Sequence, residues 1–155
     1  MQVGGAMTKP LKIGRHTVRY PLIQGGMGVR ISAGRLAGHI AKNGGVGLVA
    51  AAGIALNSGL YDGKNFFQAE ADAFKAELRK AYEIAPDGVI GVNVMVALSD
   101  FESLVKAAIE GGAKVIVCGA GLPMGLPELT SDHPDIALVH FQRLGYGIVE
   151  TTTLI

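Results

Sequence analysis

The segment that most constrains the fold is a short apolar stretch that runs directly into glycines, at residues 21–28 (PLIQGGMG). Pro21 to Gln24 has the composition of a short buried strand, and the glycines follow at once. A strand that ends in glycines before a helix leaves free N–H groups at its carboxyl end, where α/β proteins bind ligands. A Cβ there would block the close approach of the backbone to a flat or anionic ligand. Glycines recur at Gly53 and at 119–121 (GAG), so the sequence predicts several ligand-facing strand ends.

Apolar runs alternate with segments of helical periodicity along most of the chain. Alternation around Gly14 predicts a hairpin over 11–20, and the further strands are expected at 21–24, 46–52, 89–96, 113–118 and 136–139. Helices are expected at 33–42 with Ser32 as N-cap, at 65–84 with Asn65 as N-cap, from a capping box at 99–102, and as one turn near 126–129. Continuously apolar strands joined by helices predict an α/β fold with a parallel sheet.

The helical periodicity also predicts which side chains are buried. The first helix should bury Leu36, Ala37, Ile40 and Ala41, and the second should bury Phe67, Ala71, Phe74, Leu78 and Ala81. Charged residues of the second helix are expected on a solvated face: Lys75, Glu77, Arg79 and Lys80.

Composition excludes several classes of protein. With 155 residues, 49% of them hydrophobic and 17% charged, the chain is expected to form one globular domain. A net charge of +1 is not the excess of positive charge that would indicate binding to nucleic acid or to an anionic membrane. The chain lacks the apolar run of about 18 residues that a membrane span needs. Residues 1–10 contain no apolar h-region, so a secretory signal is not expected. One cysteine excludes an intrachain disulfide and fits a reducing compartment, so a cytoplasmic location is expected.

Residues with reactive or metal-binding side chains show no site pattern. Cys118 is expected to be a small buried hydrophobe at a strand end. The histidines have no metal-ligand spacing, and His140 is not expected to be catalytic: they are His16, His39, His133 and His140. The glycines after residue 118 do not match the dinucleotide fingerprint, because the last spacing is one residue too long. No metal ligand and no catalytic residue is predicted.

Four motifs in register resemble one family. They are 20–28 (YPLIQGGMG), 31–47 with its ending AKNGGVG, 91–95 (GVNVM) and 117–123 (VCGAGLP). Together they resemble the nitronate monooxygenase (2-nitropropane dioxygenase) family and the related FMN-dependent enoyl-ACP reductases, over residues 11–139. The resemblance implies an FMN-binding TIM barrel. A whole barrel takes roughly 250 residues, so this chain would hold about five of eight units and be truncated. Length alone would favour an open doubly wound sheet.

The resemblance also implies roles for individual residues. Gly25, Gly26 and Met27 would lie against the flavin ring, and Asn93 would bind FMN. The substrate side would be formed by Gly119, Ala120 and Gly121. The family's phosphate-binding loops, and the histidine that follows its sixth strand, have no counterpart in the 155 residues. We therefore expect a disordered extension at 1–10, a partial barrel at 11–139 and an aberrant tail at 140–155, from a truncated or frame-shifted gene product.

Several functions remain open on these residues. The resemblance implies FMN-dependent oxidation of an alkyl nitronate by O2, with impaired activity in a truncated chain. NAD(P)H-dependent reduction of an enoyl thioester is the alternative within the family. Two further alternatives remain. One is a fragment without catalysis, which would self-associate through open sheet edges, and the other is an independent flavodoxin-like domain. The expected partner is a small-molecule substrate.

Overall fold

A five-stranded sheet forms the centre of the molecule. The computed structural model describes residues 9–56, 58–144 and 148–154. The sheet has the order β3 (Val46–Ala50), β4 (Val89–Met95), β5 (Val115–Gly119), β6 (Ala137–Leu144) and β7 (Ile148–Leu154). Strands β3 to β6 are mutually parallel, whereas β7 pairs antiparallel with β6. The prediction of parallel β/α units is confirmed.

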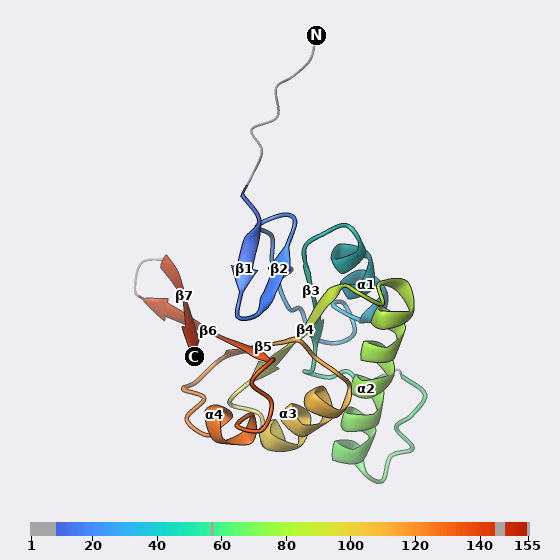
Figure 1. The fold of residues 1–155 in the computed structure, drawn as a ribbon. Helices are drawn as coiled ribbons and strands as arrows, with labels where there is room; N and C mark the ends of the chain where they lie inside the picture. Colours follow the sequence, from blue (N-terminus) through green and yellow to red (C-terminus); the bar gives the residue numbers. More distant parts are fainter. Residues whose placement is uncertain (1–8, 57, 145–147, 155) are drawn as a thin grey trace.

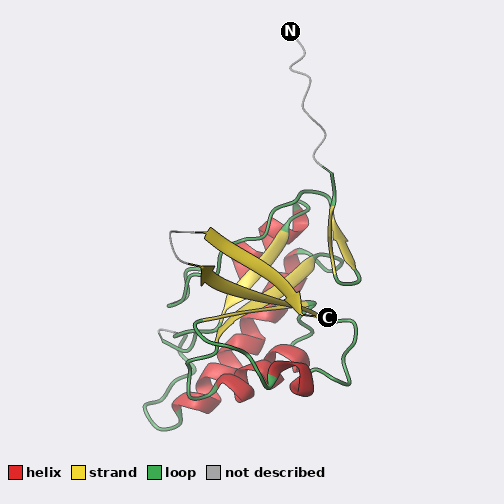
Figure 2. Cartoon of the chain, turned by 90° about the vertical axis from the view of Figure 1, so that its left-hand side faces the viewer, coloured by secondary structure: helices red, strands yellow, loops and turns green. Residues whose placement is uncertain are grey.

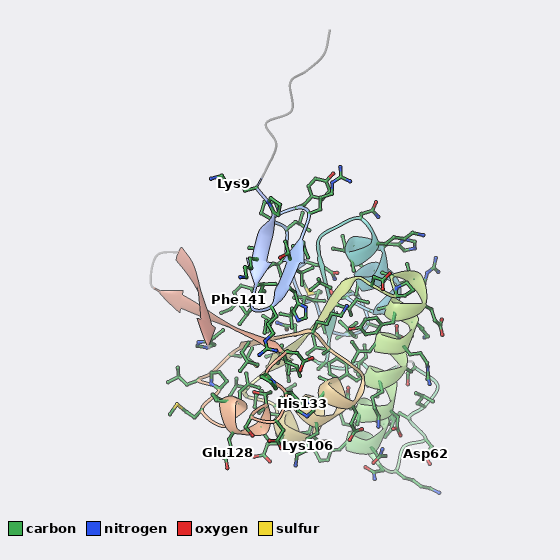
Figure 3. The ribbon with its side chains drawn as sticks, in the orientation of Figure 1. Lys9, Asp62, Lys106, Glu128, His133 and Phe141 are labelled. Atoms are coloured by element: carbon green, nitrogen blue, oxygen red, sulfur yellow. The ribbon has the colours of Figure 1, made fainter. Side chains whose placement is uncertain are left out.

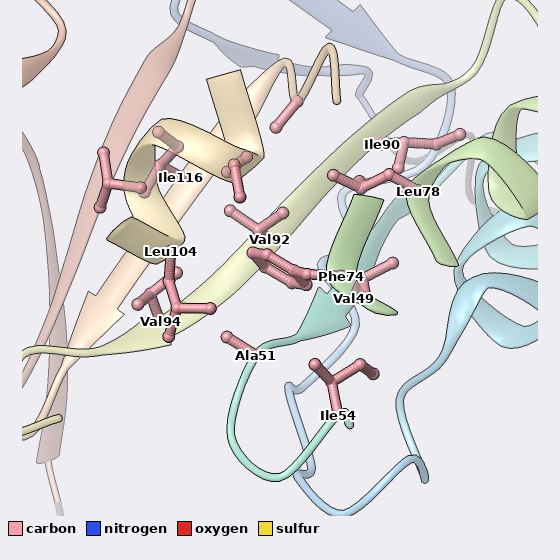
Figure 4. Close-up of a cluster of buried hydrophobic side chains, with 14 of the residues drawn as sticks. Val49, Ala51, Ile54, Phe74, Leu78, Ile90, Val92, Val94, Leu104 and Ile116 are labelled. Atoms are coloured by element: carbon pink, nitrogen blue, oxygen red, sulfur yellow. The ribbon is translucent and has the colours of Figure 1, made fainter. Parts of the chain in front are cut away.

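Helices cover one face of this sheet. They are α1 (Gly34–Lys42), α2 (Phe66–Ile84), α3 (Phe101–Glu110) and α4 (Leu126–Leu129), and they lie together on one side of the strands (Figures 1 and 2). Phe74 of α2 and Leu104 of α3 meet outward-facing strand residues in the main apolar core (Figure 4). The strand residues in this core are Val49, Ile90, Val92, Val94, Ile116, Cys118 and Leu138. This burial of apolar surface holds the helical layer against the sheet.

The opposite, inner face of the sheet is covered by a hairpin at one end. The predicted hairpin is confirmed as β1 (Leu11–Ile13) paired antiparallel with β2 (His16–Val18). Its apolar residues bury inner-face positions of the neighbouring strands, and Phe141 packs at the margin of this cluster (Figure 3). His16 Nε2 lies 2.8 Å from the carbonyl oxygen of Asp135, just before β6 begins. The hairpin therefore covers the amino-terminal ends of the strands and does not reach their carboxyl ends.

The predicted strand at residues 21–24 is shorter than expected. Only Ile23 forms a parallel bridge, with Val46. Beyond this bridge the side chain of Gln24, instead of the backbone, pairs with β3. Its Nε2 donates to the Leu48 carbonyl at 3.1 Å, and its Oε1 accepts the Leu48 N–H at 3.2 Å. The amide thus continues the ladder along β3 while the main chain turns away at Gly25.

Two predicted helix caps are wrong, and one is confirmed. α1 has Ala33 as its N-cap, and α3 has Asp100, neither with a side-chain capping bond. Asn65 does cap α2, because its Oδ1 accepts the N–H of Gln68 at 3.2 Å. Ser32 is buried instead and bonds within the preceding loop, where tertiary contacts outweigh local capping preference.

The predicted buried faces need correction at four residues. Leu36 and Phe67 are 43% and 52% exposed, and Ile40 is only half-buried, whereas Glu77, expected in solvent, is buried. α1 buries small residues because it lies very close to β3: a Cβ at Gly47 would be 1.9 Å from the Ala37 carbonyl oxygen. Such an approach leaves no room for a leucine between helix and sheet.

The last predicted strand extends further than residues 136–139. β6 runs to Leu144, and β7 pairs with it from Leu144↔Ile148 to Leu138↔Leu154. Most of the predicted 140–155 tail is therefore part of the sheet, while residues 145–147 and 155 lie outside the described residues, as do residues 1–8 of the predicted extension. Among the described residues, no helix is long and apolar enough to cross a membrane.

Candidate functional site

The carboxyl ends of the strands bring two of the predicted site residues into contact. A Cβ built on Gly26 would lie 2.4 Å from Cβ and 2.9 Å from Oδ1 of Asn93. Gly26 belongs to the loop of residues 25–32, which we call the first strand-end loop, and Asn93 belongs to β4. The loop therefore crosses over the inner face of the sheet at this point. Glycine is required at position 26 because any side chain would collide with Asn93.

Asn93 has an amide that is available to a ligand. The residue is half-buried near the carboxyl end of β4, and its main-chain carbonyl accepts the N–H of Ala51 at 2.9 Å. Its side chain makes no hydrogen bond to another residue in the part of the chain that the structure describes. A carboxamide offers two donors and one acceptor group, and a half-buried one is expected to find partners.

The first strand-end loop is braced by Ser32. The Ser32 hydroxyl accepts the Met27 N–H at 2.9 Å and donates to the Gly25 carbonyl at 3.1 Å, and the Ser32 N–H donates to the Met27 carbonyl at 2.9 Å. A Cβ on Gly25 would have no atom within 4 Å, and the Met27 side chain is 60% exposed. The loop is thus held in shape by its own serine while it presents open backbone outward.

Backbone strain occurs in two of the strand-end loops. Val29 and Arg30 have φ of 51° and 64°, and Ala120 has φ of 58°. Positive φ is uncommon outside glycine and is an outlier for a β-branched residue such as valine. Each such residue costs on the order of 1–3 kcal/mol, and strain of this kind is concentrated at ligand and active sites. The Val29 N–H donates to the Ala52 carbonyl at 2.8 Å, which ties the strained loop to the one after β3.

The predicted substrate-side residues lie at the carboxyl end of β5, the strand next to β4, and just after it. Gly119 is the register partner of Met95, and its carbonyl accepts the Val96 N–H at 2.9 Å. Ala120 and Gly121 are exposed. His140 of β6 is buried and lies with Nε2 3.0 Å from the Gly121 carbonyl oxygen, a bond that requires the proton on Nε2. This histidine holds the loop backbone, a role that its sequence context did not indicate.

Cys118 has the structural role that the sequence predicts. Its side chain is fully buried in the core between sheet and helices. Burial raises the pKa of the Cys118 thiol to about 12, so the reactive thiolate is absent near neutral pH.

We expect Cys118 to resist thiol-specific reagents in the folded chain. Disulfide-exchange labelling should be far slower in buffer than in denaturant, because only unfolding exposes the sulfur. The same sample labelled in urea supplies the control for the thiol content. Rapid, complete labelling under native conditions would contradict the buried position.

Sequence reasoning missed two buried carboxylates on α2. Glu70 Oε2 accepts the N–H groups of Ile54 and Ala55 at 3.0 and 3.3 Å. Glu77 Oε2 accepts the Gly34 N–H at 2.8 Å. Their positions, seven residues apart and in phase with Phe74, were the available signal, since that spacing places them on the buried stripe.

A hollow of about 770 Å³ lies between α2 and α3. It is lined by residues such as Lys75, Ser103 and Lys106. None of the predicted site residues lines it, so we do not connect it with the strand-end site. Among the described residues, no group of three or more His, Cys, Asp or Glu could hold a metal ion.

Comparisons with known proteins bear on the family and the fold. A solved structure described as "FabK (M276A) mutant from Thermotoga maritima" superposes with a TM-score of 0.62 at 20% identity, which shows a shared fold. The alignment covers 79% of this chain and 36% of that chain, so this chain spans little more than a third of its length. No match was found among curated proteins. The family model described as nitronate monooxygenase matches residues 9–138, most of the chain, and this protein therefore belongs to the nitronate monooxygenase family.

Proposed function

We propose that this chain supplies part of the flavin site of an FMN-dependent oxidoreductase that oxidises alkyl nitronates with O2. The observation that carries the proposal is the contact between Gly26 and Asn93 at the carboxyl ends of the strands. Membership of the nitronate monooxygenase family supports the same reaction class.

The described residues fit a flat, polar-edged cofactor such as FMN. The absence of side chains at Gly25 and Gly26 would let the ring lie against the loop backbone, with Met27 beside it. The Asn93 amide would hydrogen-bond the polar edge of the ring, because a carboxamide matches both donors and acceptors. When bound, FMN supplies the redox chemistry, and the protein supplies binding, orientation and electrostatics.

The loop after β5 would form the substrate side of this site. Gly119, Ala120 and Gly121 would leave space next to the ring, and Leu122 and Met124 in the same loop are 64% and 83% exposed. Exposed apolar side chains at a ligand-facing loop suit an alkyl substituent. Reduction of an enoyl thioester with NAD(P)H is the second candidate, since the same ring and loop would serve it.

Titration of the purified full chain with FMN tests the proposal. We expect the visible flavin band to shift and its fluorescence to be quenched on binding, and Asn93→Ala to weaken the affinity about tenfold, the effect of one lost hydrogen bond. The Asn43→Ala variant is the control. This exposed asparagine is the C-cap of α1, away from the first strand-end loop, and its side-chain amide donates to the His39 carbonyl oxygen.

Two outcomes decide the proposal. No spectral change with a chain that is folded by circular dichroism would refute flavin binding. If FMN binds, O2 uptake with an alkyl nitronate supports the proposed reaction, whereas NAD(P)H oxidation that requires an enoyl thioester supports the second candidate.

A further inference from the structure

α2 buries two carboxylates against the strand-end loops. Glu70 and Glu77 are 2% and 3% exposed, and two helical turns separate them, so they lie on the same face of the helix. A buried carboxylate is costly unless it is hydrogen-bonded or paired with a charge. The groups that bond each carboxylate therefore indicate what its burial achieves.

Glu70 holds the loop that follows β3. Its Oε2 accepts the N–H groups of Ile54 and Ala55, and this turn carries Ala52, whose carbonyl accepts the Val29 N–H at 2.8 Å. A Cβ on Gly28 would lie 2.8 Å from the same Ala52 oxygen. Glu70 is thus connected, through one turn of chain, to the strained part of the first strand-end loop.

Glu77 holds the other end of that first loop. Its Oε2 accepts the Gly34 N–H at 2.8 Å, at the start of α1, and its Oε1 lies 3.5 Å from Nη2 of Arg30 and 2.7 Å from Nζ of Lys80. The first turn of α1 contains no acidic residue. Glu77 therefore supplies, from a different helix, the negative charge that favours a helix N-terminus.

We propose that α2 acts as a clamp. In this clamp Glu70 and Glu77 are positioning residues that fix the conformation of the first strand-end loop, which carries Gly25, Gly26 and Met27. The link to flavin affinity rests on the proposed function, whereas the positioning of the loops rests on the contacts alone.

The two carboxylates differ in what can replace them. Glu70 faces backbone N–H groups, and its Oε1 has no partner among the described residues. Burial, with a smaller contribution from Asp100, raises the pKa of Glu70, which fits a site where a neutral acceptor suffices. Burial alone would raise the pKa of Glu77, but the hydrogen bonds from Lys80 and from the Gly34 N–H lower it further than burial raises it. The lowered pKa fits a site that requires a charged carboxylate. Glutamine should therefore replace Glu70 but not Glu77.

Amide exchange of the full chain, followed by NMR, tests the clamp without any flavin. In Glu70→Ala we expect exchange at Ile54, Ala55 and Val29 to accelerate about tenfold, the effect of a lost hydrogen bond, with exchange in the sheet unchanged. Glu70→Gln should restore all three rates. The matched control is Glu83→Ala, which removes an exposed glutamate from the same helix.

The response of Val29 separates a clamp from a local contact. If exchange accelerates only at Ile54 and Ala55, or at none of the three amides, the clamp is refuted. For the other carboxylate, Glu77→Gln should accelerate exchange at Gly34, whereas an unchanged Gly34 rate would overturn its part in the clamp.

FMN titration of the same variants connects the clamp to the site. We expect Glu70→Ala to bind FMN about tenfold more weakly, and Glu70→Gln and Glu83→Ala to bind like the parent chain. If the parent chain does not bind FMN, the proposed function fails while the exchange data still decide the clamp. If it binds and Glu70→Ala binds equally well, the link between clamp and flavin is refuted.

Discussion

Phe74→Ala should lower the free energy of unfolding by about 3–5 kcal/mol, the usual cost of deleting a buried aromatic side chain. Phe74 is fully buried where α2 meets the outward-facing residues of the sheet, including Val49 and Val92 (Figure 4). Removal of the ring would leave a cavity between the two layers. Because a domain of this size has about 5–15 kcal/mol of stability in total, the variant should approach the unfolding threshold. Urea denaturation followed by circular dichroism measures the loss.

Phe67→Ala on the same helix is the matched control. Phe67 is 52% exposed, so its truncation should change the free energy of unfolding by no more than about 0.5 kcal/mol. Equal losses in the two variants would show that α2 packs with a different face toward the sheet. An unfolded Phe74→Ala chain beside a stable Phe67→Ala chain would agree with the structure.

Gly26→Ala should abolish most of the flavin affinity that we propose. The new methyl group would stand 2.4 Å from Cβ of Asn93, so either the loop or the strand must move. Neither is a flexible side-chain end, and the proposed ring site depends on both. We expect the dissociation constant for FMN to rise by more than about a hundredfold, since a small displacement of binding groups has large effects. Fluorescence quenching by the chain measures it.

Gly25→Ala tests whether FMN binding depends on the close contact between Gly26 and Asn93 or on any loss of glycine from this loop. A methyl group at position 25 meets no atom within 4 Å, so the chain should keep its stability and loop shape. Because the proposed ring lies against this backbone, the added methyl group should still weaken FMN binding, but less than Gly26→Ala, which also displaces the loop or Asn93. If both variants bind equally well, the Gly26–Asn93 contact is not part of a flavin site.

Local patterns predicted the β/α elements well. The hairpin, the cap at Asn65 and the one-turn helix at 126–129 all form where the sequence indicates. These signals act over a few neighbouring residues, although the caps predicted at Ser32 and at residues 99–102 show that tertiary contacts can override such a signal. The family membership likewise follows from short motifs in register, and the family match over 9–138 confirms it.

Predictions failed where distant segments meet. Ser32 looked like a helix cap, yet it braces the 25–32 loop, since that loop had to be held in a strained conformation. Glu77 looked solvent-facing beside Lys75, Arg79 and Lys80, but α2 buries it to meet the start of α1. Helical periodicity alone could not distinguish a charged residue in solvent from one that serves a buried N–H group.

The sequence by itself determined the parallel β/α order, the family, and the glycine positions at the strand ends. Only the tertiary structure decided that Gly26 touches Asn93, that Phe74 rather than Phe67 fills the core, and that Glu70 and Glu77 bond two separate loops. The physical reason is that secondary structure depends on neighbours in the chain. Burial and close approach depend instead on which faces meet, and small residues such as Gly47 permit α1 to lie so close to β3.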